Sequence, residues 1–283
     1  GGGEPAVTLL LVLAAAFGAV VGSFLNVVIY RLPRGESFGL SRSRCPQCGA
    51  GIAWYDNIPL LSYAVLRGRC RHCSGRISPR YPLVEAVTAA LFALGLARTH
   101  DLEPLILGFL VYASFVAVLV AAAAIDFQHK LLPDKLTLRA GPVVGVAGSL
   151  LLPAIHGTSL FGQDLAQAMK PGLASLIVGL VGAAVGAGAV WLLRAFGTWI
   201  ARREAMGLGD VKFLGMCGLL LGPIGVLLAL GVGIVTGGIL GVLIWAVTRN
   251  REIPFGPFLA LGAASALFYG SALRALVGRL YGF

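Results

Sequence analysis

Two aspartates stand at the edges of long apolar runs, where an ionisable side chain is costly to place. Asp126 ends the uncharged run 104–125, and Asp210 follows Gly207-Leu208-Gly209 at the start of another apolar run. Two carboxyls held close together cannot both ionise cheaply, so they share a proton. One of them can then act as a base on water while the protonated one polarises a peptide carbonyl. The pair therefore predicts acid–base hydrolysis, with Asp126 and Asp210 as the catalytic residues.

The same aspartates have alternative interpretations. Each could cap a helix or pair with a nearby cation, and the candidate cations are Lys130, Arg203 and Lys212. Asp134 is expected to follow this structural alternative, because Leu-Pro-Asp before an apolar run is typical of a helix N-cap. An ion-coupled membrane transporter is the functional alternative, because paired carboxyls also serve proton relays. Transporters usually bind near the membrane midplane, whereas these aspartates lie at one edge.

Four cysteines have the spacing of a metal site. Cys45-Pro46-Gln47-Cys48 and Cys70-Arg71-His72-Cys73 are two Cys-x-x-Cys pairs, separated by 21 residues in a polar segment. Four thiolates presented by two tight turns match tetrahedral zinc, and four protein ligands leave no open position for water. We therefore predict a structural Zn²⁺ site made of Cys45, Cys48, Cys70 and Cys73. Two disulfides or four free thiols are the alternatives, and His72 could replace one ligand.

Transmembrane helices are the elements that must position these groups. Of the 283 residues, 58% are hydrophobic and only 12% are charged, about half the charged fraction of a soluble domain. A run of about 20 apolar residues spans a bilayer core as a helix. The composition excludes a single water-soluble core, a disordered chain and a small secreted disulfide scaffold. The uncharged runs are 5–30, 104–125, 140–163, 171–193, 213–248 and 253–273.

These runs predict an all-α polytopic membrane protein with about eight transmembrane helices. The run 213–248 is too long for one helix and contains the turn signal Gly222-Pro223, so we divide it near there. Glycine pairs at Gly-x-x-x-Gly spacing, such as Gly18/Gly22 and Gly182/Gly186, are expected to be helix-packing faces. The predicted helices are 6–30, 83–98, 104–125, 134–153, 172–194, 211–229, 231–248 and 255–280.

Three regions follow from this division. Residues 1–30 form the first transmembrane helix, preceded by a glycine triplet that is interpreted as an artificial remnant. Residues 31–82 form a small zinc-binding insert between the first and second helices, and residues 83–283 form a membrane-embedded core of about seven helices. The fifth cysteine, Cys217, lies alone inside the core and is expected to be a packing residue.

The distribution of basic residues predicts the orientation. Of the 22 Lys and Arg, 18 lie in four connecting segments that an eight-helix chain places on one side. Under the positive-inside rule this side is cytoplasmic, so both termini are periplasmic. The insert then lies in a reducing compartment, which disfavours disulfides. Because the membrane topology of the chain explains its excess of basic residues and net charge of +10, we expect no nucleic-acid partner. The four segments are 31–82, 126–139, 194–212 and 249–252.

The combination of these motifs resembles the bacterial type IV prepilin peptidases, a family of bifunctional leader peptidases and N-methyltransferases. The resemblance extends over nearly the whole chain, through the four cysteines, Asp126 and Gly207-Leu208-Gly209-Asp210 with Lys212. Five further motifs carry it: Phe24-Leu25-Asn26-Val27-Val28-Ile29-Tyr30-Arg31-Leu32-Pro33, Asn57-Ile58-Pro59, Arg80-Tyr81-Pro82-Leu83-Val84-Glu85, Leu132-Pro133-Asp134 and Pro254-Phe255-Gly256-Pro257-Phe258.

The resemblance implies an aspartic endopeptidase of the bacterial inner membrane, of the Gly-x-Gly-Asp class. Its members cleave the basic leader of type IV prepilins and type II secretion pseudopilins at the cytoplasmic face. Many members then methylate the new N-terminus using S-adenosylmethionine, a step in which the insert is implicated. Glu36, Gly68 and Arg69 match positions tied to methylation, and the family commonly has lysine in place of Arg69. Residues 253–258 are expected either to line the peptide groove or simply to begin a helix.

Overall fold

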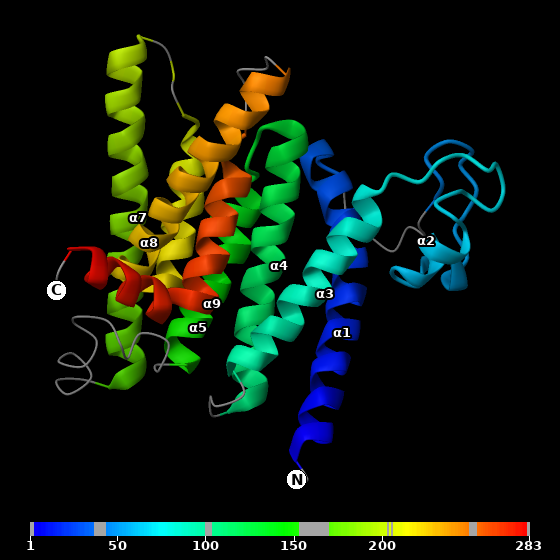
Figure 1. Cartoon of the computed structure of the whole chain (residues 1–283), viewed down its shortest axis with the longest axis horizontal. Helices are drawn as coiled ribbons and strands as arrows, with labels where there is room; N and C mark the ends of the chain where they lie inside the picture. The colour runs from blue at the N-terminus through cyan, green and yellow to red at the C-terminus, as the bar shows by residue number, and fades with distance from the viewer. Residues whose placement is uncertain are drawn as a thin grey trace. The chain divides into compact units, whose positions relative to one another are not determined.

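The computed structural model describes residues 3–36, 44–99, 104–152, 170–202, 204, 206–248 and 254–281. The chain divides into two compact units, Gly1–Leu105 and Ile106–Phe283 (Figure 1). Within the described residues, six helices are long and apolar enough to cross a membrane. These helices make the chain a multi-pass membrane protein.

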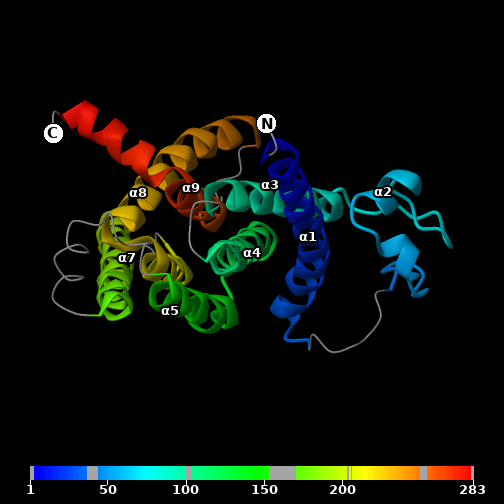
Figure 2. The ribbon, with the colours of Figure 1, turned by 90° about the horizontal axis from the view of Figure 1, so that it is seen from below.

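The first unit is built on two long helices that lie side by side in both views of the ribbon (Figures 1 and 2). They are α1 (Gly3–Arg31) and α3 (Arg80–Thr99). Gly18 and Gly22 of α1 lie against α3, and a Cβ added at Gly22 would be 2.7 Å from the Cα of Glu85. Only glycine allows the two backbones to approach this closely, so the predicted packing role of this pair is confirmed.

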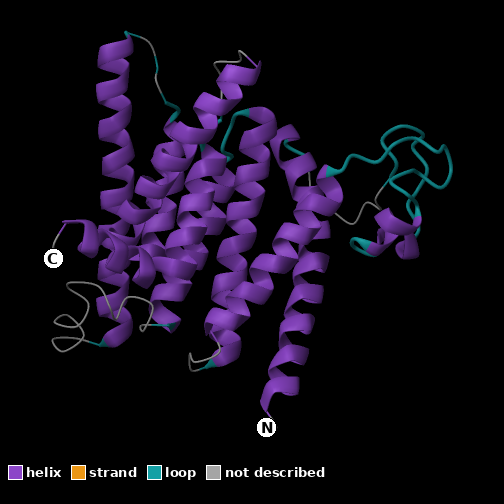
Figure 3. Ribbon diagram, viewed as in Figure 1, coloured by secondary structure: helices purple, strands orange, loops and turns teal. Residues whose placement is uncertain are grey.

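Among its described residues, 32–36 and 44–79, the segment between α1 and α3 has three short helical pieces: η1 (Leu32–Arg34), η2 (Trp54–Asn57) and α2 (Leu61–Val65). The rest of its described part is turns and two isolated β-bridges (Figure 3). A buried carboxylate attaches this segment to the helix pair, because the backbone N–H of Leu60 donates to Oε2 of Glu85 at 2.8 Å. Glu85 is 8% exposed, so the N–H of Leu60 provides a hydrogen bond that a buried carboxylate needs.

The second unit contains α4 (Leu105–His129), the π-helical segment η3 (Lys135–Ala140) and α5 (Gly141–Leu151). It continues with α7 (Pro171–Ala201), α8 (Leu208–Thr248) and α9 (Gly256–Tyr281). Gly182 and Gly186 of α7 lie against the backbone of α8: an added Cβ would lie 2.3 Å from the Gly218 carbonyl and 2.6 Å from that of Leu214. This confirms the packing role predicted for the second glycine pair.

The helix α8 is broken in its first half. Gly222 has φ 69° and ψ 179°, and Pro223 follows it. Proline removes a helical hydrogen bond, and glycine alone adopts such a positive φ without strain. The predicted break is therefore present, but it lies at Gly222 and not between the predicted helices 211–229 and 231–248. The yellow first part and the gold-to-orange second part run in opposite senses in Figure 1.

The count of eight transmembrane helices stays a prediction. Five of the six apolar helices correspond to predicted helices, and the sixth is α8, which contains the sequence of two predicted ones. The predicted helix 134–153 is represented by η3 and α5, and its last residue lies outside the described residues. Cys217, expected to be a packing residue, is fully buried in α8.

Candidate functional site

The two aspartates singled out by the sequence lie at one end of the second unit. Asp126 stands in the last turn of α4 and Asp210 in the first turn of α8. Their exposed fractions are 6% and 9%, respectively, and each carboxyl lies within electrostatic range of the other. Two buried carboxyls that interact electrostatically are the arrangement expected of a proton-sharing pair.

A third segment completes this end of the unit. The backbone N–H of Gly256, the first residue of α9, donates to Oδ2 of Asp126 at 2.9 Å. The first N–H groups of a helix have no partner inside the helix and carry its positive dipole end, so a carboxylate satisfies them. Residues 253–258 were expected either to line a groove or to begin a helix. The helix entry is present, and it contacts Asp126; Ile253 lies outside the described residues.

The sequence pointed to Gly256 only as part of the segment 253–258 and gave this glycine no role of its own. A Cβ at this position would lie 2.5 Å from Oδ2 and 2.8 Å from Cγ of Asp126. The contact is therefore possible only for a residue without a side chain. The signal in the sequence was the glycine between two prolines in Pro254-Phe255-Gly256-Pro257, but nothing in it identified Asp126 as the partner.

We expect Gly256→Ala to reduce hydrolysis at the aspartate pair about a hundredfold, because a displacement of about 1 Å at a reacting group has an effect of that size. The helix itself should tolerate alanine, which is a better helix former than glycine. Gly238→Ala is the matched control, since a Cβ there meets no atom within 4 Å. Equal activity of both variants, measured at equal folded yield, would show that the contact is unimportant.

The glycines before Asp210 differ in their surroundings. A Cβ on Gly209 would lie 3.1 Å from the Cβ of Leu132, so this glycine lets the loop after α4 approach the start of α8. A Cβ on Gly207 would lie 4.0 Å from Oδ2 of Asp210. Of the two glycines, Gly209 is therefore the one at a close approach between segments, and Gly207 lies beside the Asp210 carboxyl.

The expectation for Asp134 was wrong in its detail. Asp134 occupies the position before η3, but its side chain makes no capping hydrogen bond. Its carboxylate instead pairs with Nζ of Lys212 at 2.7 Å. The cation two residues after Asp210 offers a charged partner, and a charge-assisted bond is stronger than a bond to a neutral backbone N–H. Lys212 therefore pairs with Asp134. Arg203, the other distant candidate cation, lies outside the described residues.

The second candidate site is the cysteine cluster of the insert. The sulfur atoms of Cys45, Cys48, Cys70 and Cys73 all lie within 4.8 Å of one another. The Sγ atoms of Cys45 and Cys73 are 3.9 Å apart, close to the edge of about 3.8 Å that Zn–S bonds of about 2.3 Å impose on a tetrahedron. The structure therefore brings together the four predicted ligands in an arrangement that fits a tetrahedral metal ion.

The two cysteine turns have the same local structure. Cys45 N–H donates to Ala50 O and Cys70 N–H to Gly75 O, both at 2.9 Å. Backbone N–H groups of Cys48 and Gln47 lower the pKa of the Cys45 thiol to about 7, and those of Cys73 and His72 lower the pKa of Cys70. These hydrogen bonds stabilise the thiolate, the form that binds a metal. Each turn thus prepares its first cysteine for coordination.

An ion pair joins the second cysteine turn to η2. Arg71 donates from Nε to Oδ2 of Asp56 at 2.8 Å and from Nη2 to Oδ1 at 2.6 Å. The side chain of Asp56 is only 9% exposed. Hydrogen bonding from Arg71, together with the charges of Arg71 and His72, holds the pKa of the Asp56 carboxyl below its usual 3.8 despite burial.

This pair makes the insert sensitive to acid in a predictable direction. Because the folded pKa of Asp56 is depressed, its stabilising contribution is complete above the unfolded value of 3.8 and disappears as the pH falls through the folded pKa. We expect Asp56→Asn to lower the unfolding temperature of the insert at neutral pH, and the difference from the unmodified chain to shrink in acid. Trp54 emission, with the variant and the unmodified chain at equal metal content, measures this. A difference that grows toward acid would contradict the assignment.

The three residues tied to methylation by resemblance lie in two parts of the first unit, Glu36 after η1 and the adjacent Gly68 and Arg69 before Cys70. Glu36 is exposed just after η1, with its backbone N–H donating to Arg31 O at 3.1 Å. Gly68 is buried with φ 67°, against the ring of Tyr63, and Arg69 is exposed beside Cys70. Within the described part of this unit, no hydrogen bond or ion pair joins Glu36 to Gly68 or Arg69. A side chain at Gly68 would be strained, so this glycine has a backbone role.

The fold and the two sites define a multi-pass membrane protein with a buried aspartate pair and a four-cysteine insert. Two family profiles match it: the Bacterial Peptidase A24 N-terminal domain over residues 16–99, and the Type IV leader peptidase family over residues 113–242. Together with the relatives described next, these matches show that the chain belongs to the type IV leader peptidase family.

Curated relatives match over most of the chain. A prepilin leader peptidase/N-methyltransferase of Burkholderia pseudomallei is 34% identical, over 95% of this chain and 88% of its own length. One of Myxococcus xanthus is 37% identical, over 90% of this chain and 65% of its own length. A third relative, from an Escherichia coli strain, is named "Type 4 prepilin-like proteins leader peptide-processing enzyme". It is 34% identical, over 91% of this chain and 93% of its own length. No solved structure shows significant similarity to the chain.

Proposed function

We propose that this chain is a bifunctional membrane enzyme that removes the basic leader of type IV prepilins and then methylates the new N-terminus. Family membership and the names of the relatives support both activities. The observation that carries the proposal is the pair of buried carboxyls, Asp126 and Asp210, at one end of the unit, where the start of α9 donates a hydrogen bond to Asp126. Type II secretion pseudopilins, which carry the same kind of leader, are included as substrates.

In the proposed cleavage step, Asp126 and Asp210 share one proton. Asp126 is the ionised member of the pair in this step, because the N–H of Gly256 stabilises one of its oxygens and charge-assisted hydrogen bonds favour the ionised form. It removes a proton from water, whose oxygen attacks the carbonyl carbon of the scissile peptide while Asp210 donates its proton to the carbonyl oxygen. When the tetrahedral intermediate collapses, protonated Asp126 donates its proton to the leaving amine, and Asp210 takes a proton back from one of the two hydroxyls as the new carboxyl forms.

The proposed membrane orientation places this chemistry at the cytoplasmic face. Eighteen of the 22 Lys and Arg lie in segments 31–82, 126–139, 194–212 and 249–252, which the positive-inside rule assigns to the cytoplasm. A basic leader stays on that side for the same reason, so the junction with the substrate's apolar helix arrives at the edge of the membrane. The enzyme then resides in the bacterial inner membrane, with both termini in the periplasm.

Methylation is assigned to the insert, and zinc to its cysteine cluster. The four thiolates would hold Zn²⁺ with no open position, so the metal has a structural role. S-adenosylmethionine supplies the methyl group when bound. The exposed carboxylate of Glu36 has the charge that a sulfonium requires, and Arg69 is exposed beside the cluster. We propose that Glu36 and Arg69 serve the methylation step, and that the positive φ of Gly68 sets the backbone direction at the neighbouring Arg69.

Mass spectrometry of a co-expressed prepilin tests both activities on one spectrum. We expect loss of the leader together with the mass of one added methyl group. A prepilin that keeps its leader in the presence of the folded chain would overturn the proposal. Leader loss without methylation would support the proposed peptidase activity and contradict the proposed methyltransferase activity. An ion-coupled transporter is not supported, because the peptidase family profile covers both aspartates.

A further inference from the structure

A run of apolar side chains is exposed on the insert. Seven large apolar residues within 52–65 are more than a third exposed, and Trp54 and Val65 reach 80% and 66%. On spanning helices such exposure is explained by lipid, but α2 and η2, of five and four residues, are too short to cross a bilayer. A surface in water rarely groups large apolar residues in this way, so a partner is expected. The apolar segment consists of Ile52, Trp54, Tyr55, Ile58, Leu60, Leu61 and Val65.

Two hydrogen bonds hold the apolar segment in place. Oγ of Ser62 donates to the carbonyl oxygen of Tyr55 at 2.9 Å, which joins α2 to η2. The N–H of Leu60 donates to Oε2 of Glu85 at 2.8 Å, which joins the segment to α3. Glu85 lies five residues after the first residue of α3, or about 7 Å along the helix axis. Because α3 is a spanning helix, the apolar segment is held at the level where the hydrocarbon core meets the headgroups.

The insert around the apolar segment is basic. Residues 37–79 contain six arginines and one acidic residue. Zinc held by four thiolates would lower this excess by two charges without reversing it. Two exposed arginines flank the apolar segment: Arg44 forms a β-bridge with Gly51, the residue before the segment, and Arg67 follows Val65 by two residues. Basic side chains beside an apolar surface complement the anionic headgroups and acyl chains of a charged bilayer.

We infer that the insert docks on the membrane surface through its apolar segment, with anionic phospholipid as the partner. Trp54 and Tyr55 have the amphipathic rings that concentrate at the boundary between lipid and water. Leu61 and Val65 of α2 enter the acyl boundary, and the two flanking arginines contact lipid phosphates. Both ends of the insert continue into α1 and α3, so the association is intramolecular. Docking also keeps the insert at the depth at which a membrane-anchored substrate is cut, a consequence that rests on the proposed function.

Quenching of Trp54 by brominated lipid tests the inference in the full chain. Trp191, Trp199 and Trp245 are replaced by phenylalanine, so that emission reports on Trp54 alone. The chain is placed in nanodiscs that contain phosphatidylglycerol or only phosphatidylcholine, each brominated near the headgroup end of the acyl chains. We expect strong quenching with phosphatidylglycerol and weaker quenching with phosphatidylcholine alone. No substrate is present, so the result does not depend on the proposed enzymatic activities.

Two variants locate the contact. Val65→Asp places a charge in the apolar segment and should abolish the quenching of Trp54. Because Val65 is exposed, its replacement leaves no cavity, and unchanged hydrogen exchange at the two cysteine turns shows that the insert is still folded. Arg67→Gln should lower the ratio of docked to undocked insert about fivefold, the effect of one basic residue near an anionic surface.

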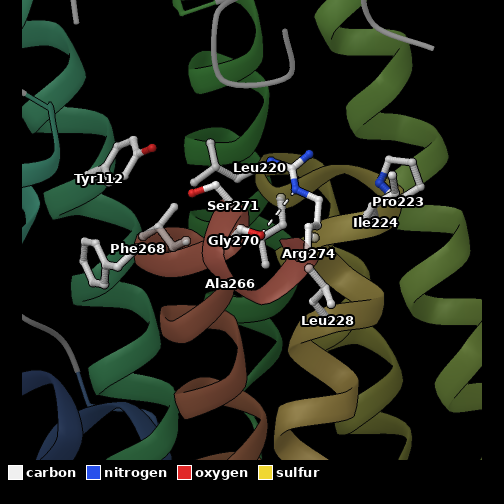
Figure 4. Close-up of a pocket in the computed structure, with 13 residues that line it drawn as sticks. Tyr112, Leu220, Pro223, Ile224, Leu228, Ala266, Phe268, Gly270, Ser271 and Arg274 are labelled. Atoms are coloured by element: carbon white, nitrogen blue, oxygen red, sulfur yellow. Dashed lines mark hydrogen bonds between the residues drawn. The ribbon is translucent and has the colours of Figure 1, made fainter. Parts of the chain in front are cut away.

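Arg274→Gln is the matched control for the loss of one charge. Arg274 belongs to the second unit, where it lines a cavity of about 260 Å³ with residues such as Tyr112 and Leu228 (Figure 4). Trp54 quenching in this variant should equal that in the unmodified chain. If Arg67→Gln and Arg274→Gln lower quenching equally, general charge attracts the bilayer and the flanking arginine has no special part.

Three further results would overturn the inference. If Trp54 is shielded from aqueous acrylamide but is not quenched by brominated lipid, protein covers the apolar segment, from the second unit or from another chain. If Trp54 is open to acrylamide and unquenched in both lipid mixtures, the segment stays in water. Equal quenching in the two mixtures would show that anionic headgroups are not the partner.

Discussion

Asp126→Asn and Asp210→Asn are each expected to reduce leader cleavage by about ten-thousand-fold or more, the scale seen when one member of a catalytic unit is removed. Asparagine is nearly isosteric with aspartate, so packing at these buried positions is preserved. It cannot exchange a proton, however, and both carboxyls are needed in the same step. The double variant should therefore be no worse than either single variant, which a cleavage assay on a prepilin in detergent measures.

Asp134→Asn is the matched control for this prediction. Asp134 lies at the same end of the second unit but is exposed, and it pairs with Lys212. An exposed ion pair contributes only about 0–1 kcal/mol, so cleavage by this variant should persist. The unmodified enzyme should show a bell-shaped pH dependence, because a proton-sharing pair fails when it gains a second proton or loses its last one. Substantial cleavage by either Asp126→Asn or Asp210→Asn would contradict the proposed mechanism in which both carboxyls act.

The combined replacement Cys45→Ser and Cys48→Ser is expected to abolish zinc binding and unfold the insert. Structural zinc contributes about 10–16 kcal/mol in small domains, more than a short segment with three brief helical pieces can replace. Methylation should be lost while leader cleavage is largely retained, because both aspartates belong to the other compact unit. Metal analysis measures the zinc content of the chain. The mass of the co-expressed prepilin shows whether the leader has been lost and whether a methyl group has been added.

Cys217→Ala controls for the loss of a thiol. Cys217 is fully buried in α8 and lies outside the cluster, so this variant should still bind one zinc ion per chain. Zinc content should also fall with acid in the unmodified chain, since the thiolates must be deprotonated to bind. An unchanged metal content in the Cys45→Ser and Cys48→Ser double variant would contradict the four-thiolate site.

The sequence was sufficient for the features that depend on local pattern. Apolar runs placed four of the helices to within about four residues, since bilayer thickness fixes the length of a spanning helix, whereas α7 continues to Ala201, beyond its predicted end at 194. The spacing of the cysteines identified four residues whose sulfur atoms are close together. The sequence also placed Asp126 and Asp210 at one edge of the membrane, and the structure brings them within electrostatic range.

Features that depend on contacts between distant segments were not predictable. Gly256 meets Asp126 across 130 residues of sequence, and the bond exists only because two helix ends converge. The N–H of Leu60 meets Glu85 through the folding of the insert. Asp134 has the sequence signature of a cap, but a lysine 78 residues away takes its carboxylate. Local propensity cannot indicate which of several competing partners a polar group will meet in the folded chain.

The contact between Gly256 and Asp126 also sets the order in which the enzyme can mature. A ribosome that has produced α4 and α8 has already delivered both aspartates to the bilayer, but the donor arrives only with α9. Until α9 inserts, the carboxylate of Asp126 lacks the backbone group that holds it in place. We therefore expect a nascent chain to carry both acids without the donor that orients Asp126, and cleavage to begin only after α9 has inserted.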